Sequence, residues 1–429
     1  MSRTCPLLTV QPSRGLVDEK FVITVKHLPP KQEVTLYSLH ECENGNFWEA
    51  FGHYVSDPQG AVSGTDDASV GGTYEGIEPM GLLWSMRPVP GSKPGLRLRK
   101  KNVQTPVVVQ IFVYMGHLNQ GFREQVALAC SPVERWYMAP GVQRVDVTDP
   151  LVRGTLFLPP GPGPFSAILE IGGAGGGMVE YRSAILASHG FVSMTLEYHS
   201  AETVKADIHL LYFEKAFRIL QEHPLVASEC VALLGLSYGC YISLYMAVHS
   251  EVAKPRCCVC IGGSHVKSTK TAFAPPWEFF KQNMSKMHID KENCVIWKDT
   301  LLPISSDLDT KLDVRKIKCP LLLVNGLDDQ GLPAAESAED MHMMMEKAGN
   351  SHLLTVLSYP ETGHLIEPPY SPHCRASILF LDSSLYMMML WGGQSKPHAD
   401  AQEQSWRKIL EFLQQHLYYG KDSAPLSRL

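Results

Sequence analysis

From residue 165 onward the sequence alternates short apolar runs with longer amphipathic segments, and this alternation limits the fold more than any other feature. Expected strands cover 165–171, 191–198, 230–235, 257–263, 319–326 and 352–360; expected helices cover 181–190, 203–223, 238–250, 333–348 and 400–417. Strands that alternate with helices indicate a largely parallel sheet covered on both faces. Residues 263–315 fit this alternation poorly, and we expect them to form a cap over the carboxyl edge of the sheet.

The first 140 residues have a different pattern. Short runs rich in β-branched and aromatic residues are separated by turn residues, which predicts an antiparallel, immunoglobulin-like β-sandwich. Pro140 and Gly141 interrupt the chain where this pattern ends. For a chain of 429 residues we therefore expect a β-sandwich domain over 1–140, an α/β domain over 141–418 and a flexible tail over 419–429.

Composition excludes several classes of protein. A net charge of −6 argues against a nucleic-acid-binding protein. The N-terminal segment has no apolar core typical of a secretory signal, and the chain has no apolar run of membrane-spanning length. The 11 cysteines are scattered and odd in number, which favours reduced thiols. We expect no membrane span, no metal site and no cofactor.

The motif with catalytic potential is Gly-Leu-Ser-Tyr-Gly, residues 235–239. A Gly-x-Ser-x-Gly motif alone is common, but here an apolar strand precedes it and a helix follows, as a nucleophile elbow requires. The alternative is that Ser237 only caps the helix, a role that would not need a glycine on each side. The motif therefore predicts Ser237 as a nucleophile.

An acid and a base should follow Ser237 in chain order, each after a later strand. Asp328 and Asp329 follow the strand 319–326, and we favour Asp329 as the acid, with Asp328 as the fallback. His364 follows the strand 352–360, after a turn containing Gly363, and is the expected base.

An oxyanion hole should use the N–H group of Tyr238, the residue after the nucleophile, and an N–H group from the loop after the first strand of the α/β domain. That loop, Gly-Gly-Ala-Gly-Gly-Gly over 172–177, lacks the spacing of a dinucleotide fingerprint. We expect Gly173 and Ala174 to supply the second donor.

Other groups in the sequence have structural interpretations. Cys257 and Cys260 are three residues apart in a strand-like run, and no second pair at zinc spacing exists, so they are expected to be buried thiols. Cys240, near the start of the helix after Ser237, is expected to contribute to packing. The basic stretch 97–102 is expected to be a solvated loop, with contact to a phosphorylated substrate as the alternative.

Long segments of the chain resemble the acyl-CoA thioesterase / bile acid-CoA:amino acid N-acyltransferase family. They include RGTLFLPPGPGPF (153–165), SYPETGHLIEPPYSP (358–372) and WGGQSKPHADAQEQSW (391–406), and the similarity covers nearly the whole chain. The resemblance implies a β-sandwich followed by an α/β-hydrolase domain. It also implies acyl-CoA substrates and a triad of Ser237, Asp329 and His364.

The family has two branches, which differ in nucleophile and acyl acceptor. Thioesterases use Ser and water, whereas the conjugating enzymes use Cys and transfer the acyl group to glycine or taurine. Ser237 favours hydrolysis of fatty acyl-CoA, because an oxygen ester is attacked less readily by amines than a thioester is. Transfer to taurine or glycine is the alternative, since Tyr238, Cys240 and the residues after Asp329 depart from the usual thioesterase pattern.

The chain ends in Ser427-Arg428-Leu429, which resembles the C-terminal tripeptide that the peroxisomal import receptor reads. Peroxisomes handle acyl-CoA esters, and some members of the family are peroxisomal. We therefore expect the peroxisome as the compartment and its import receptor as a partner, with a cytoplasmic location as the alternative.

Overall fold

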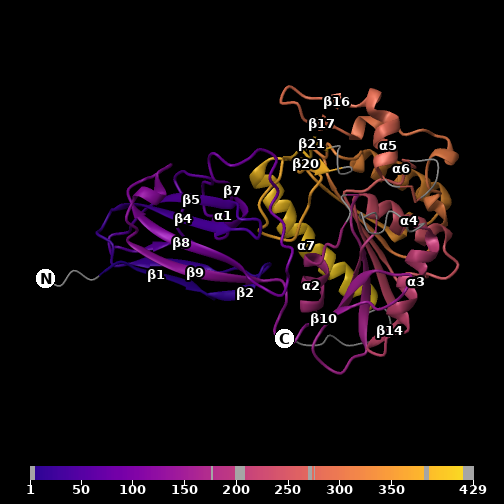
Figure 1. Cartoon of the computed structure of the whole chain (residues 1–429), viewed down its shortest axis with the longest axis horizontal. Coiled ribbons are helices and arrows are strands. Elements are labelled where there is room, and N and C mark those ends of the chain that lie inside the picture. Colours follow the sequence, from indigo (N-terminus) through magenta and orange to yellow (C-terminus); the bar gives the residue numbers. More distant parts are fainter. Residues whose placement is uncertain are drawn as a thin grey trace. The chain divides into compact units, whose positions relative to one another are not determined.

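A computed structural model of the chain describes residues 5–174, 177–198, 208–268, 273–274, 276–380 and 386–418 (Figure 1). These residues fall into two units. The first runs to Ala139 and also includes Glu367–His373, while the second comprises Pro140–Ile366 and the residues from Cys374 on. The sequence predicted two contiguous ranges, which put residues 367–373 in the α/β domain. The structure groups these residues with the first unit instead. The expected tail, 419–429, lies outside the described residues.

The first unit is built from two sheets, as the β-rich pattern predicted. One sheet has the order β1-β3-β6 and the other β2-β9-β8-β4-β5-β7. Neighbouring strands are antiparallel except β2 and β9, which are parallel. The strands are β1 (Leu7–Gln11), β2 (Arg14–Leu16), β3 (Val22–Lys26), β4 (Glu33–Glu41), β5 (Phe47–Val55), β6 (Val62–Ser63), β7 (Arg87–Pro88), β8 (Val107–Met115) and β9 (Ala129–Trp136), with the short helices α1 (Gly81–Trp84) and η1 (Phe122–Glu124) between them.

The second unit contains an eight-stranded sheet in the order β10-β11-β13-β12-β14-β15-β18-β19. From β13 to β19 neighbouring strands are parallel, and β10 and β11 form an antiparallel edge. The strands are β10 (Gln143–Asp146), β11 (Gly154–Leu158), β12 (Phe165–Ile171), β13 (Val192–Leu196), β14 (Val226–Leu236), β15 (Cys258–Ile261), β18 (Leu321–Gly326) and β19 (Leu354–Tyr359). The strand expected at 165–171 is confirmed at both ends, and the predicted α/β architecture is confirmed.

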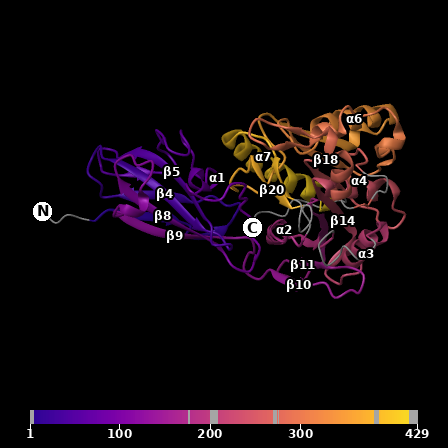
Figure 2. The ribbon, with the colours of Figure 1, turned by 45° about the horizontal axis from the view of Figure 1, so that its top comes forward.

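Helices cover both faces of this sheet, as its buried parallel strands require. Figures 1 and 2 show α3 and α4 on one side of the sheet and α2 and α7 on the other. The helices are α2 (Tyr181–Ser188), α3 (Leu210–Gln221), α4 (Tyr238–His249), α6 (Ala334–Ala348) and α7 (Ser395–Leu417). Helix α7 begins at Ser395, five residues before the expected start. Pro397 is tolerated there because it falls in the first turn, where backbone N–H groups need no partner within the helix.

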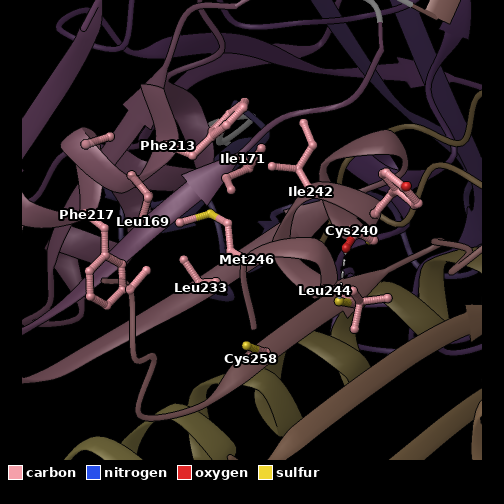
Figure 3. Packing of buried hydrophobic residues seen from close by; sticks show 14 of the residues in the cluster. Leu169, Ile171, Phe213, Phe217, Leu233, Cys240, Ile242, Leu244, Met246 and Cys258 are labelled. Atoms are coloured by element: carbon pink, nitrogen blue, oxygen red, sulfur yellow. Dashed lines mark hydrogen bonds between the residues drawn. The ribbon is translucent and has the colours of Figure 1, made fainter. Parts of the chain in front are cut away.

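The core of the second unit lies between α3, α4 and the sheet (Figure 3). Phe213 and Phe217 of α3 are fully buried. Leu169 and Leu233 pack into the same cluster from neighbouring strands β12 and β14. This packing fixes β12 beside β14, and so brings the loops that follow these two strands together.

Residues 263–315 contain short elements rather than a further strand–helix unit. Two strands of this segment, β16 and β17, pair with a later hairpin, β20–β21, and form a second sheet in the order β16-β17-β21-β20. The elements are α5 (Pro276–Asn283), η2 (Met284–Lys286), β16 (His288–Ile289), β17 (Val295–Ile296), η3 (Lys298–Leu301), η4 (Leu308–Thr310) and η5 (Val314–Lys316), and the hairpin is β20 (Ala376–Phe380) and β21 (Tyr386–Leu390). The remaining short helix is η6 (Ser351–Leu353).

Among the helices of the described ranges, none combines the length and the apolar character needed to cross a bilayer.

Candidate active site

Ser237 lies at a sharp turn between the end of β14 and the start of α4. Its backbone angles, φ 56° and ψ −120°, are sparsely populated by residues other than glycine and carry strain. The flanking glycines make the turn possible. A Cβ on Gly239 would lie 2.0 Å from the carbonyl oxygen of Ile171, and one on Gly235 would lie 2.5 Å from that of Gly239. The local geometry is that of a nucleophile elbow.

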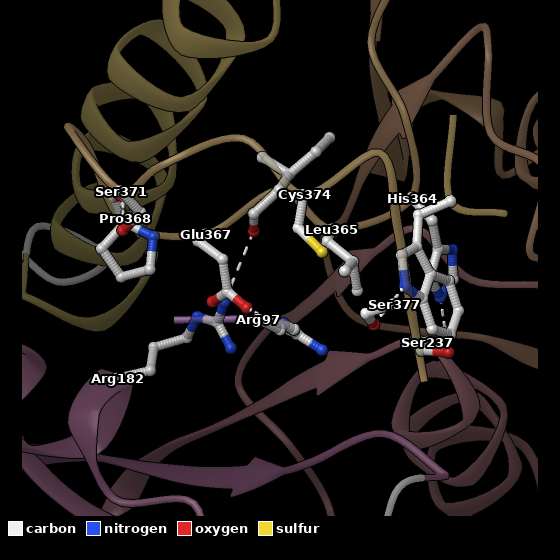
Figure 4. Close-up of polar contacts among 12 residues, drawn as sticks. Arg97, Arg182, Ser237, His364, Leu365, Glu367, Pro368, Ser371, Cys374 and Ser377 are labelled. Atoms are coloured by element: carbon white, nitrogen blue, oxygen red, sulfur yellow. Dashed lines mark hydrogen bonds and ion pairs between the residues drawn. The ribbon is translucent and has the colours of Figure 1, made fainter. Parts of the chain in front are cut away.

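The hydroxyl of Ser237 does not cap the helix that follows it. Instead, its Oγ lies 2.8 Å from Nε2 of His364 (Figure 4). His364 follows β19 and is only 2% exposed. The helix-cap interpretation of Ser237 therefore does not describe the contacts of this side chain.

Asp329 completes a chain of three side chains. Its Oδ2 lies 2.8 Å from Nδ1 of His364, and its Oδ1 accepts the backbone N–H groups of Gly331 and Leu332 at 2.8 and 2.9 Å. Because an ionised carboxylate only accepts hydrogen bonds, Nδ1 carries the hydrogen and Nε2 is left to accept the hydroxyl hydrogen of Ser237. The imidazole is thus held in the tautomer that a general base needs.

Asp328, the fallback acid, has other partners. Its Oδ2 accepts the N–H group of Gly393 at 2.7 Å, and its Oδ1 accepts the side-chain amide of Gln330 at 2.7 Å. The structure therefore brings Asp329, and not Asp328, to the histidine. Asp328 therefore links its own loop, which follows β18, to the loop after β21.

Three further residues surround the imidazole of His364. The ring of Trp391 stacks on it at a centroid distance of 5.4 Å and an angle of 17°. A Cβ on Gly331 would lie 3.0 Å from Cγ of His364, and one on Gly262 would lie 3.3 Å from Nδ1. The indole N–H of Trp391 donates to Oγ of Ser377 at 2.8 Å, which fixes the stacked ring in turn. The imidazole is thus held by close packing as well as by hydrogen bonds.

The loop after β12 approaches the nucleophile. A Cβ on Gly173 would lie 3.3 Å from Cβ of Ser237, a tight contact that shows how close this loop comes to the nucleophile. Ala174 packs against the core of the second unit, and Tyr238 opens α4. Gly175 and Gly176 lie outside the described residues. The three residues expected to form the oxyanion hole therefore lie in the two segments that meet at Ser237.

The thiols near Ser237 have structural surroundings. Cys240 is fully buried, and its Sγ lies 3.1 and 3.2 Å from the carbonyl oxygens of Gly235 and Ile261, which share its one S–H donor. Burial raises its pKa well above the usual value. A protonated thiol in this position packs and donates rather than attacks. Cys257 and Cys260 are buried and form no disulfide, and the same holds for Cys258 between them. Within the described ranges, no group of acidic, His and Cys side chains could hold a metal ion.

The basic stretch 97–102 of the first unit uses several of its cations internally. The Nζ atom of Lys100 lies 2.7 Å from the carboxylate of Glu43, and its side chain is only 8% exposed. Arg97 pairs with Glu367, and Lys101 donates to the side chain of Asn44. Figure 4 shows Arg97 beside Glu367. These contacts favour a role in holding the loops of the first unit together.

Sequence reasoning missed Gly262, Gly331, Trp391 and His398, all of which lie at or beside His364. Trp391 and His398 fall in a segment, WGGQSKPHADAQEQSW, that carried the family resemblance but received no role. The available signal was the pair Gly392-Gly393 just before the helix, followed by His398 in the first turn of that helix. Their contact with His364 depends on the folding of segments distant in sequence.

Comparison with known proteins gives a consistent result across both units. Residues 18–149 match the family described as "Acyl-CoA thioester hydrolase/BAAT N-terminal region", and residues 208–419 match "BAAT / Acyl-CoA thioester hydrolase C terminal". The chain is 36% identical over 426 residues to "Peroxisomal succinyl-coenzyme A thioesterase" of Mus musculus, covering 96% of each chain. It is 34% identical over 429 residues to "Acyl-coenzyme A thioesterase 2, mitochondrial" of Homo sapiens, covering 97% of this chain and 85% of the relative.

Among solved structures, a dienelactone hydrolase-like promiscuous phosphotriesterase from metagenomic libraries is similar over 64% of this chain and 98% of its own, with a TM-score of 0.40 and 16% identity.

The close approach at Gly239 leads to a direct test of the elbow. The Gly239→Ala change places a methyl group against the carbonyl oxygens of Ile171 and Gly172, at 2.0 and 2.5 Å, so the turn must shift. We expect the rate at which a fluorophosphonate labels Ser237 to fall at least about tenfold, since small displacements of reacting groups are costly. The control is His249→Ala, an exposed position at the far end of the same helix. A labelling rate for Gly239→Ala equal to that of the control would contradict the proposed constraint.

Proposed function

Because this chain belongs to the acyl-CoA thioester hydrolase/BAAT family of α/β serine hydrolases, we propose that it hydrolyses fatty acyl-CoA to the free fatty acid and CoA. The observation that carries this proposal is the hydrogen-bonded chain from Ser237 through His364 to Asp329, with 2.8 Å at each step. Such a chain activates a serine for attack on a carbonyl carbon.

In the first half of the reaction, Oγ of Ser237 attacks the thioester carbonyl while Nε2 of His364 takes the hydroxyl proton. Asp329 stabilises the imidazolium that forms, through the hydrogen bond to Nδ1. The tetrahedral intermediate collapses by breaking the C–S bond, and the sulfur of the departing CoA takes the proton from Nε2 of His364, which leaves the imidazole neutral again. The acyl group is then an oxygen ester of Ser237.

In the second half, His364 removes a proton from a water molecule that attacks this ester. The second tetrahedral intermediate releases the fatty acid and returns the proton to Ser237. In both halves the carbonyl oxygen becomes negatively charged. We assign its stabilisation to the N–H groups of Tyr238 and of the Gly173–Ala174 segment, supported by the placement of Gly173 beside Ser237.

Burial makes this arrangement effective. Asp329 and His364 are each 2% exposed, so the charge interaction between carboxylate and imidazolium is weakly screened. The two backbone N–H groups on Oδ1 of Asp329 fix the direction of the carboxylate. The site is therefore organised before the substrate arrives.

The acyl acceptor is tested by product analysis. Purified protein is incubated with medium-chain, long-chain, succinyl and bile acyl-CoA esters, with and without taurine or glycine, and free acid and amide are quantified separately. We expect free fatty acid as the product in all cases with fatty acyl-CoA, because Ser237 forms an oxygen ester that activated water attacks. Amide formation that accounts for most of the turnover would instead establish the N-acyltransferase activity.

The two neighbouring aspartates form a matched pair for the acid. Asp329→Asn exchanges an oxygen of the carboxylate for an amide and disturbs the tautomer of His364, so we expect kcat to fall on the order of 10⁴-fold, as when the acid of such a triad is converted to an amide. Asp328→Asn alters contacts to Gly393, Gln330 and Arg375, none of which involves His364, and we expect a loss of less than about tenfold, the value of one hydrogen bond. Steady-state hydrolysis measures both. A reversed order of the two losses would assign the role to Asp328.

We further propose that the protein resides in the peroxisome and binds the import receptor through Ser427-Arg428-Leu429. The support is the tripeptide together with a relative of peroxisomal name, whereas a second relative carries a mitochondrial name.

The test is the location of two fluorescent fusions in cells. A fusion that leaves the C-terminus free should enter peroxisomes, and one that blocks it should remain in the cytoplasm. Entry of the blocked fusion into peroxisomes would show that the tripeptide is not the signal.

A further inference from the structure

His398 has no role in the reaction described above, yet it holds the backbone on both sides of His364. It lies in the first turn of α7 and is 1% exposed. Its Nδ1 accepts the backbone N–H of Gly363 at 3.1 Å, and its Nε2 lies 2.9 Å from the carbonyl oxygen of Leu365. One imidazole thus bridges the residue before the proposed base and the residue after it.

These two bonds define the chemical form of His398. A neutral imidazole has one N–H donor and one lone-pair acceptor. The N–H group of Gly363 requires Nδ1 to be the acceptor, and the carbonyl of Leu365 requires Nε2 to be the donor. A charged imidazolium has two donors and no acceptor, so it could not accept from Gly363. His398 is therefore neutral, in the Nε2–H tautomer.

The segment that His398 bridges has little freedom elsewhere. The N–H group of His364 donates to the carbonyl oxygen of Trp391 at 2.9 Å. A Cβ on Gly363 would lie 2.4 Å from the carbonyl oxygen of Gly392, so the two loops touch backbone to backbone. The bridge from His398 therefore joins a loop that is already packed against the residues leading into α7.

The bridge from His398 matters for the base because it fixes the backbone from which the imidazole of His364 projects. The imidazole must meet Asp329 and Ser237 at 2.8 Å simultaneously, and its direction follows from the backbone of residues 363–365. Figure 4 shows Leu365 next to His364 along this loop. A rotation of the loop that lengthened either contact would weaken the transfer of the proton from Ser237.

We propose that His398 is a positioning residue for the reaction, fixing the backbone on both sides of His364 so that its imidazole meets Ser237 and Asp329 together. This inference rests on the proposed roles of Ser237 and His364. It assigns His398 no contact with substrate and no proton transfer. Its effect acts through the orientation of the base.

Three substitutions separate the two bonds. His398→Ala removes both and leaves the buried N–H of Gly363 and carbonyl of Leu365 without this partner. His398→Asn places an amide oxygen near the position of Nδ1, so it keeps the acceptor for Gly363. His398→Gln reaches toward the position of Nε2 and keeps the donor to Leu365.

Gln402 provides the matched control. It lies one helical turn further along α7, is fully buried, and its side-chain amide has no hydrogen-bond partner within the described ranges. Gln402→Met changes a buried polar side chain of the same helix without touching a bond to the His364 loop. We expect its kcat to match that of the full-length wild-type protein.

Two rates are measured on each folded full-length variant, below its melting temperature: acyl-CoA hydrolysis, as kcat and KM, and labelling of Ser237 by a fluorophosphonate. We expect His398→Ala to lower kcat and the labelling rate about 10- to 100-fold, with KM changed less than about twofold. His398→Asn and His398→Gln should fall between Ala and wild type, each rescued by its remaining bond.

Several results would overturn the inference. One is a folded His398→Ala protein with wild-type kcat and labelling rate, even if its melting temperature is lower, because the role would then be structural only. If the Ala variant does not fold, wild-type rates for both Asn and Gln variants have the same meaning. An equal loss in Gln402→Met would also contradict a specific role for His398.

The labelling rate separates this inference from the proposed function. A wild-type protein that is labelled at Ser237 but hydrolyses no acyl-CoA would contradict the proposed substrate, and the comparison of His398 variants by labelling would still stand. A folded wild-type protein that the fluorophosphonate does not label would contradict both.

Discussion

Ser237 is held at φ 56° and ψ −120°, a conformation that the chain sustains because glycines at 235 and 239 allow β14 and α4 to meet the backbone of neighbouring segments. The strained turn lifts the hydroxyl to the carboxyl edge of the sheet. Parallel strands all end at that edge, so the loops after β12 and β19 meet at Ser237, and the loops after β15 and β18 reach His364 beside it. The site of this chain is thus a consequence of strand direction combined with one tight turn.

His364 is the point at which most of these loops meet. Its imidazole contacts Ser237 and Asp329 by hydrogen bonds, and Trp391 stacks on its ring. Glycines at 262 and 331 allow the loops after β15 and β18 to lie within van der Waals distance of the same ring. Because folding has already fixed the positions of these groups, little reorganisation remains to be done when charge develops in the reaction.

The sequence was sufficient for the features that local pattern determines. Strand 165–171 was predicted with its exact bounds, and the glycines around Ser237 and the order of Asp329 and His364 pointed to residues that the structure brings together. It was insufficient where a contact joins segments that are distant along the chain. Trp391 and His398 reach His364 only because the β20–β21 hairpin and α7 fold back onto the loop after β19, and the return of Glu367–His373 to the first unit has the same character.

The most direct measurement is the location of the acyl group during turnover. The protein is mixed with a fatty acyl-CoA, quenched within one turnover, digested and analysed by mass spectrometry. We expect the mass of the acyl group on the peptide that contains Ser237, and we expect Ser237→Ala to lack this adduct and to lose turnover by roughly 10⁶-fold, as other serine hydrolases do without their nucleophile. An acyl group on a different residue, or near-normal hydrolysis by Ser237→Ala, would contradict the role of Ser237 as the nucleophile.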